Sequence, residues 1–113
     1  MKYITFTIPC YNSENYMRRC VDSLLVGGED VEILIIDDGS SDRTGAIADE
    51  YEMLYPNIVK AVHKPNGGHG SGVNKGLELA HGLYYKVVDS DDWFDRDAYL
   101  KMLDKIKSFL NKI

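Results

Sequence analysis

The four-residue segment 89–92 contains three carboxylates, those of Asp89, Asp91 and Asp92. It directly follows an apolar run that ends at Val88. Carboxylates this close repel one another unless a cation or hydrogen-bond donors compensate their charge. Hard oxygen ligands suit Mg²⁺ or Mn²⁺, which proteins often hold with one or two carboxylates plus substrate phosphates. The alternative is a solvated acidic loop in which Asp95 caps the next helix. The position after a buried strand favours a metal or ligand site.

A second acidic pair, Asp37 and Asp38, ends another apolar run in the same way. Asp-Gly followed by two serines is turn and helix-cap chemistry, whereas an aspartate at a site can accept hydrogen bonds from a ribose or a base. The residue types leave both interpretations open. Tyr11 poses a similar choice, because its ring can stack on a base at a cleft edge or pack into the core.

The loop "NGGHGSG" over 66–72 is rich in glycines, namely Gly67, Gly68, Gly70 and Gly72. Glycines let a backbone approach a ligand closely, and the N-terminus of a following helix favours anions. The loop matches neither the GxGxxG dinucleotide fingerprint nor a P-loop, so a flexible turn is the alternative. His69 lies in this loop.

The histidines and cysteines do not suggest a metal centre or a nucleophile. His63, His69 and His81 lack metal-ligand spacing, and we expect them to be structural or surface residues. Cys10 and Cys20 are expected to be reduced thiols of a cytosolic protein. The N-terminus is not a signal peptide and no run is long enough to span a membrane. We therefore predict a cytoplasmic protein, and leave open a peripheral membrane attachment through segments outside this chain.

Bulk properties narrow the class of partner. The 113 residues suffice for one compact domain, and 44% hydrophobic with 27% charged residues is a globular composition. The formal net charge of −5 argues against nucleic acid as a partner, because that would call for a basic face. A small anionic ligand remains compatible with this charge if it arrives with a metal cation.

Alternating patterns predict the elements that position these residues. Apolar runs predict strands over 3–9, 31–37, 58–64 and 83–89, and helical spacing predicts helices over about 13–25, 40–54 and 71–80. Asn12 or Ser13 should cap the first helix, Ser40 or Ser41 the second, and Asp95 a last helix. The residues expected to face inward on the second helix are Ile47, Ala48, Tyr51 and Leu54.

This order predicts an α/β fold: a Rossmann-like parallel sheet of about four strands with helices on both faces. Ligands bind such sheets outside the carboxyl ends of the strands. The polar motifs described above, together with "PCYN" over 9–12, all follow predicted strands. We therefore expect them to converge on one cleft.

At this point the chain resembles a known family. The segments "IPCYNSENYMRRCVDSLL", "VEILIIDDGSSDRT", "NGGHGSGVNKGLELAHG" and "VVDSDDWFD" are similar to the motifs of the family 2 glycosyltransferases, which have the GT-A fold. The resemblance runs from about residue 3 to residue 100, with the motifs in the family's order. It implies a nucleotide-diphospho-sugar donor, with a UDP-sugar favoured, and inverting transfer to an acceptor hydroxyl.

The resemblance also implies roles for individual residues. Pro9 and Tyr11 match positions beside the nucleobase, Glu14 matches a nearby acidic position, and Asp38 matches the aspartate that contacts the base, with Asp37 beside it.

The remaining matches concern the metal and the phosphates. Asp89-Ser90-Asp91 matches the DxD motif, in which Asp91 would ligate a divalent ion and Asp89 would lie near the ribose or a metal-bound water. Asp92 extends the motif. The other residues of the predicted donor site are Gly68, Lys75 and Ser90.

Two departures from the family pattern stand out. Val73 occupies a position where members often carry an arginine, which leaves Lys75 as the nearest cation. The family's catalytic base and acceptor-binding elements lie further along the chain, and we find no base here. We therefore predict that residues 1–113 form a single nucleotide-sugar-binding domain that lacks the acceptor-binding part. An open sheet edge in such a half-domain favours self-association, so we expect a homodimer.

Two other functions remain in view. The first is a non-catalytic or truncated nucleotide-binding or interaction module, which donor hydrolysis or transfer would distinguish from an enzyme. The second is a receiver-like phosphoacceptor domain, which also places carboxylates and Mg²⁺ at strand ends. That class should carry paired acids after the first strand, where this chain has "PCYN".

Overall fold

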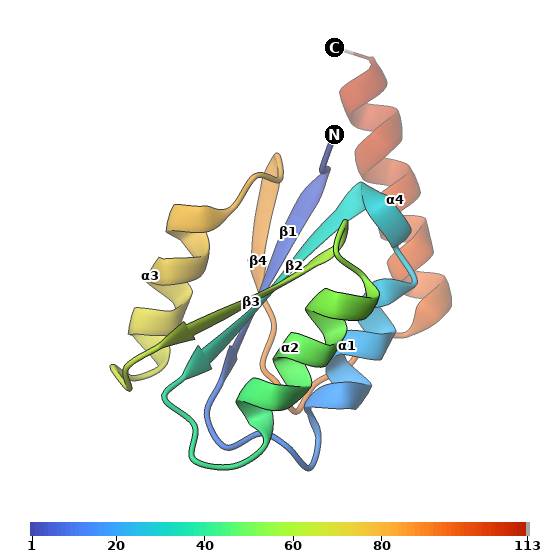
Figure 1. Cartoon of the computed structure of the whole chain (residues 1–113). Coiled ribbons are helices and arrows are strands. Elements are labelled where there is room, and N and C mark those ends of the chain that lie inside the picture. The colour runs from blue at the N-terminus through green and yellow to red at the C-terminus, as the bar shows by residue number, and fades with distance from the viewer. Residues whose placement is uncertain (113) are drawn as a thin grey trace.

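The computed structural model describes residues 1–112. Its elements follow the predicted alternation of strands and helices (Figure 1). They are β1 (Ile4–Cys10), α1 (Met17–Leu25), a short 3-10 helix η1 (Gly28–Asp30), β2 (Val31–Asp38), α2 (Thr44–Leu54), β3 (Val59–Lys64), α3 (His69–Leu79), β4 (Tyr84–Val87) and α4 (Arg96–Asn111). The strands form one four-stranded parallel sheet in the order β3-β2-β1-β4. The predicted α/β class and parallel sheet are confirmed.

Helices cover both faces of the sheet, as predicted. In Figure 1, α3 lies alone on one side, whereas α1, α2 and α4 lie on the other. The main core fills the second side, where Phe6 and Ile8 of β1 and Ile33 and Ile35 of β2 are fully buried. β1 and β2 are the two central strands, so both of their faces are covered, which explains their nearly continuous apolar runs.

The third helix packs against the sheet through glycines. A Cβ atom on Gly76 would lie 2.2 Å from the Thr7 Oγ1 atom, and one on Gly72 would lie 3.2 Å from the Pro9 Cβ atom. Only glycine therefore lets the α3 backbone approach β1 this closely. This close packing holds the N-terminus of α3, and the glycine loop before it, against the carboxyl end of β1.

The fourth strand is one of the two edge strands of the sheet, and β3 is the other. Among residues 1–112, β4 pairs with β1 alone, and its residues alternate between exposed and half-buried. Tyr84 is 42% exposed, and Leu83 just before the strand is 56% exposed. The homodimer that we expect from an open edge stays a prediction.

Several boundaries differ from those predicted. β4 ends at Val87 rather than at residue 89. α1 begins at Met17 and α2 at Thr44, and neither N-cap residue makes a side-chain cap. The predicted caps are therefore wrong for these two helices. The cap by Asp95 is confirmed, because its side chain accepts a hydrogen bond from the Ala98 backbone N–H at 2.9 Å.

The inward face of the second helix is largely as predicted. Ile47, Ala48 and Tyr51 are buried, whereas Leu54 is 68% exposed because it lies in the last turn of the helix.

The structure also bears on whether a helix could cross a membrane. Across residues 1–112, no helix combines the length and apolar character that a membrane crossing requires. The cytoplasmic location stays a prediction.

Candidate functional site

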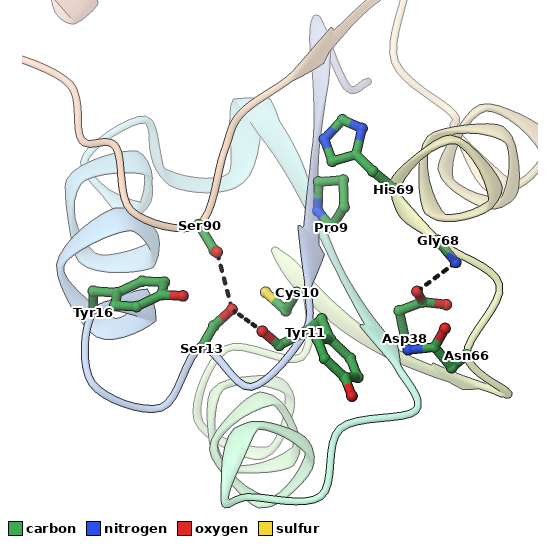
Figure 2. A pocket seen from close by; sticks show the side chains of 10 residues that line it. All are labelled: Pro9, Cys10, Tyr11, Ser13, Tyr16, Asp38, Asn66, Gly68, His69 and Ser90. Atoms are coloured by element: carbon green, nitrogen blue, oxygen red, sulfur yellow. Dashed lines mark hydrogen bonds between the residues drawn. The ribbon is translucent and has the colours of Figure 1, made fainter.

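A pocket of about 270 Å³ opens at the carboxyl edge of the sheet (Figure 2). Its lining comes from the ends of β1 and β2 and from the loops after β1, β3 and β4. The lining residues are Pro9, Cys10, Tyr11, Ser13, Tyr16, Asp38, Asn66, Gly68, His69 and Ser90. The predicted convergence of strand-end motifs on one cleft thus occurs. Of the predicted donor residues, it brings together Pro9, Tyr11, Asp38, Gly68 and Ser90.

Tyr11 is available to a ligand. It is 54% exposed, so its ring is not part of the core. Figure 2 shows the ring together with Asp38 among the residues that line the pocket. A half-exposed ring and a hydrogen-bonding carboxylate that line one pocket can together stack on a planar base and bond to its edge.

Asp38 holds the glycine loop in place through hydrogen bonds. Its Oδ1 atom accepts hydrogen bonds from Lys64 Nζ at 2.6 Å and from the Gly67 backbone N–H at 2.9 Å. Its Oδ2 atom accepts one from the Gly68 backbone N–H at 2.9 Å. Burial opposes ionisation of this carboxyl, but the hydrogen bonds from these donors outweigh burial and lower its pKa. A carboxylate has about four acceptor positions and three are used here, so Oδ2 can accept one more hydrogen bond.

Asp37 does not line the pocket. Neighbouring residues of a strand point to opposite faces, so Asp37 faces α2 while Asp38 faces the glycine loop. Its Oδ2 atom lies 2.9 Å from His63 Nδ1, and its Oδ1 atom accepts a hydrogen bond from the Ser40 backbone N–H at 3.0 Å. The structure therefore separates the two aspartates that the sequence presents as one pair.

Glu14 and Lys75, both predicted as donor-site residues, also lie outside the pocket lining. The Glu14 backbone N–H donates to Asp42 Oδ2 at 3.2 Å. The Lys75 ammonium lies 3.6 Å from Glu78 on the same helix and lines a separate shallow depression beside Lys64.

The acidic motif after β4 forms a cluster. Oxygen atoms of Asp89, Asp91 and Asp92 all lie within 4.8 Å of one another, and all three residues are exposed. Oxygen ligands at this spacing fit a hard divalent cation such as Mg²⁺ or Mn²⁺. His69 Nε2 lies 3.5 Å from Asp89 Oδ1, which connects the glycine loop to the cluster.

Two partly buried contacts fix the acidic loop to the rest of the domain. The Ser90 and Ser13 hydroxyls are 3.0 Å apart, and the Cys20 thiol lies 3.6 Å from the Asp89 carbonyl oxygen. Burial, reinforced by the nearby aspartates, raises the pKa of Cys20 to about 12. This cysteine therefore stays a neutral thiol that donates a weak hydrogen bond, as expected for a reduced structural cysteine.

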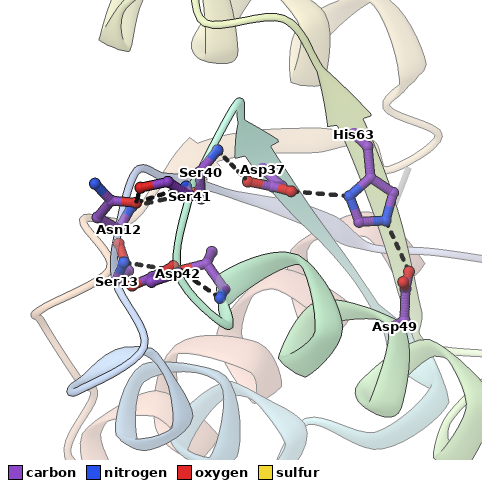
Figure 3. A network of polar contacts seen from close by, with 9 residues as sticks. Asn12, Ser13, Asp37, Ser40, Ser41, Asp42, Asp49 and His63 are labelled. Carbon is purple, nitrogen blue, oxygen red and sulfur yellow. Dashed lines mark hydrogen bonds and ion pairs between the residues drawn. The ribbon is translucent and has the colours of Figure 1, made fainter.

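A network of polar contacts joins the loop after β1 to the loop after β2 (Figure 3). The Asn12 backbone N–H donates to Ser40 Oγ at 3.0 Å, and the Asn12 side-chain oxygen accepts from the Ser41 backbone N–H at 2.9 Å. The Ser13 backbone N–H donates to Thr44 Oγ1 at 2.7 Å. These hydrogen bonds link the two loops to each other. They hold the pocket wall in place without a ligand.

Sequence reasoning missed several members of the site. The sequence predicts that Asn12 or Ser13 caps the first helix, and it presents Asn66 only as the start of a glycine-rich loop. His69 lies in the same loop, and in the structure it both lines the pocket and approaches Asp89. No signal within the sequence indicated that His63 contacts Asp37, because that contact depends on the pairing of β2 with β3.

The fold and the site define a parallel α/β domain with a ligand pocket at the carboxyl ends of its strands and an acidic cluster at the pocket's edge. The sequence model described as "Glycosyl transferase family 2" matches residues 5–110 of this chain. The chain therefore belongs to the family 2 glycosyltransferases, which confirms the resemblance and its GT-A fold.

Individual relatives agree with this assignment. The glycosyltransferase GlyA of Streptococcus pneumoniae is 36% identical over 107 residues, which cover 94% of this chain and 15% of GlyA. A crystal structure of S. aureus TarS 1-349 in complex with UDP-GlcNAc has a TM-score of 0.80 at 29% identity, covering 96% of this chain and 32% of the TarS 1-349 chain.

A more distant structure supports the fold alone. The mannosyltransferase PcManGT of Pyrobaculum calidifontis, in complex with GDP-Man and Mn²⁺, has a TM-score of 0.76 at 20% identity, covering 85% of this chain and 30% of that one. This chain spans only 29%, 15% and 36% of the length of three of its curated relatives.

Proposed function

We propose that this chain is the donor-binding part of a glycosyltransferase. It would bind a nucleotide-diphospho-sugar, with a UDP-sugar favoured, together with a divalent metal. The observation that carries the proposal is the adjacency of two features at one sheet edge. A pocket with an exposed tyrosine ring and a carboxylate acceptor lies next to three carboxylates whose oxygens are within 4.8 Å of one another.

The nucleoside would occupy the pocket. The Tyr11 ring would stack on the base over Pro9, and the open position on Asp38 Oδ2 would accept a hydrogen bond from a base N–H. Asn66 adds a side chain that can both donate and accept. Gly68 has a φ of +90° and lies directly before α3, so its backbone can lie close to the ribose or the phosphates without a side chain intervening.

The diphosphate would lie toward the acidic motif, where Asp91 and Asp89 would hold the cation. A bound cation would neutralise charge on the departing nucleoside diphosphate. Without it, three exposed carboxylates and a net charge of −5 would repel an anionic ligand. Asp37, Glu14 and Lys75 would act on the donor only through the residues they position, because none lines the pocket.

Transfer to an acceptor hydroxyl, with inversion, is our proposal for the whole protein. That step needs a base to deprotonate the acceptor, and we assign none among residues 1–112. The chain spans about a third or less of the relatives compared above, so transfer by this chain alone should be weak or absent. A non-catalytic nucleotide-binding role would share the pocket, and donor hydrolysis or transfer by the whole protein separates the two.

A thermal-shift screen tests donor binding. Wild-type protein is heated with UDP, UDP-GlcNAc or GDP-mannose, each with Mn²⁺ and with a chelator. We expect one donor to raise the Tm only in the presence of Mn²⁺, because a ligand that binds the folded state stabilises it. No Tm change with any donor would contradict the proposed donor site.

A further inference from the structure

His63 bridges two carboxylates that come from different layers of the fold (Figure 3). Its Nδ1 atom lies 2.9 Å from Asp37 Oδ2 at the end of β2, and its Nε2 atom lies 2.8 Å from Asp49 Oδ1 on α2. Gly45, in the first turn of α2, makes room for this arrangement. A Cβ atom there would lie 2.7 Å from Asp37 Oδ2 and 3.4 Å from His63 Cε1.

This geometry requires a charged imidazole. A neutral imidazole has one N–H donor and one lone pair, whereas an ionised carboxylate only accepts hydrogen bonds. Bridging two carboxylates therefore needs both ring nitrogens protonated, and loss of either proton turns one bond into a repulsive contact.

The charged groups around the ring agree with this requirement. Asp37 of β2 and Asp49 of α2 face it directly. Glu52, one turn further along α2, is hydrogen-bonded to the Ala61 backbone N–H at 2.9 Å. Hydrogen bonds to Asp37 and then Asp49 raise the pKa of His63 above its ordinary value, against a smaller opposing effect of burial.

A continuous path leads from His63 to the pocket wall. The second oxygen of Asp37 accepts a hydrogen bond from the Ser40 backbone N–H at 3.0 Å, across the turn at Gly39, whose φ is +69°. The Ser40 hydroxyl in turn accepts from the Asn12 backbone N–H at 3.0 Å. Asn12 follows Tyr11, and Gly39 follows Asp38, so the path ends beside both residues that would contact the base.

We propose that His63 is a positioning residue of the donor site: as an imidazolium it fixes Asp37, and through Asp37 the turn that holds Tyr11 and Asp38. The identity of the ligand rests on the proposed function; the positioning itself does not. A group whose pKa is higher in the folded state contributes stability that is complete below its unfolded pKa and is lost as pH rises through its folded pKa. The pocket wall should therefore become less well ordered as pH rises through the folded pKa of His63. Affinity for the donor should fall with it.

NMR tests the positioning without any ligand. In wild-type protein, His63 should titrate above its ordinary pKa of about 6.5, and the Ser40 and Asn12 amide signals should shift with the same midpoint. In His63→Gln protein these amide shifts should vanish. In Asp49→Asn protein the midpoint should fall, because one carboxylate is lost. Amides that ignore the His63 titration, or a midpoint at or below about 6.5, would overturn the positioning role.

Affinity for UDP with Mn²⁺ tests the effect on the site. The affinity of wild-type protein is divided by that of His63→Gln protein at each pH. Protonation of UDP itself affects both affinities equally, so it drops out of this ratio. We expect wild-type protein to bind about three- to tenfold tighter at about pH 6 and the two to converge by about pH 8.5. His81→Gln is the control, because His81 pairs with Glu32, away from the pocket, at 2.9 Å. It should bind like wild type throughout.

The two experiments separate the two proposals. If none of the nucleotides in the thermal-shift screen binds wild-type protein while the Ser40 and Asn12 amides still titrate with His63, the donor function is overturned and the positioning is supported. If UDP binds and His63→Gln protein shows the wild-type affinity and pH dependence, the positioning is overturned while the donor function stands.

Discussion

The hydroxyl oxygens of Ser13 and Ser90 lie 3.0 Å apart, although 77 residues separate them along the chain. Ser13 follows β1 and Ser90 follows β4, so this one contact joins the pocket wall to the loop that carries Asp89 and Asp91. The nucleoside region and the metal region of the proposed donor site are therefore mechanically connected before any ligand arrives.

Removing this contact should uncouple the two regions. We predict that Ser13→Ala weakens Mn²⁺-dependent UDP binding by roughly three- to tenfold, while the protein loses only about 1 kcal/mol of stability. Calorimetric titration and chemical denaturation measure the two quantities. Ser108→Ala, at an exposed position on α4, is the matched control and should change neither. Equal UDP affinities for Ser13→Ala and Ser108→Ala would show that the contact does not matter for binding.

Asp38 should matter for folding as well as for binding. Asp38→Asn removes the negative charge that faces Lys64 and the backbone donors of Gly67 and Gly68 in a buried position. We expect a loss of roughly 1–3 kcal/mol in the free energy of unfolding, measured by urea denaturation. Asp104→Asn, an exposed carboxylate on α4, should stay within about 0.5 kcal/mol of wild type.

The same carboxylate predicts an acid dependence. Because its pKa is lowered in the folded protein, the stability that ionised Asp38 contributes is present above its unfolded pKa and is lost as pH falls through the folded value. The stability difference between wild-type and Asp38→Asn protein should therefore shrink toward acid pH. A stability difference that stays constant down to acid pH would contradict the proposed role of ionised Asp38 in holding the glycine loop.

Two glycines of α3 should respond in opposite ways to alanine. Gly76→Ala places a Cβ atom 2.2 Å from Thr7 Oγ1 and 2.7 Å from the Tyr85 hydroxyl, so we expect a loss of about 1–3 kcal/mol. Gly70→Ala is the matched control, since in the described part of the chain no atom lies within 4 Å of its Cβ position, its chain neighbours and the nearby backbone of its own helix aside. Alanine is the better helix former there and should stabilise the protein by roughly 0.5–1 kcal/mol. Thermal unfolding of both variants tests this, and equal Tm changes would argue against the close packing of α3 on β1.

Much of the fold could be predicted because its signals are local. The run from Val31 to Asp38 is buried on both faces, so its side chains had to be apolar along nearly the whole strand. The starts of α1 and α2 could not be predicted this way. Asn12 and Ser40 have the side chains of capping residues, but they bond to each other's loop, and such contacts depend on how β1 and β2 pair.

The site divides in the same way. The gathering of strand-end motifs follows from parallel topology, so Tyr11, Asp38 and Ser90 could be placed at one edge before the structure was known. The separation of Asp37 from Asp38 was implicit in the two-residue period of a strand. The bridge from His63 to Asp37 and Asp49 was not, because it requires the register of β3 against β2 and the position of α2.

The central claim is that Asp91 belongs to a metal-dependent donor site, and the UDP dissociation constant with and without Mn²⁺ tests it most directly. In wild-type protein we predict that Mn²⁺ tightens UDP binding by about tenfold or more. Asp91→Ala should lose this metal effect, and Asp104→Ala should keep it. An equal Mn²⁺ effect in Asp91→Ala and wild-type protein, or UDP binding to wild type that is indifferent to Mn²⁺, would contradict the account.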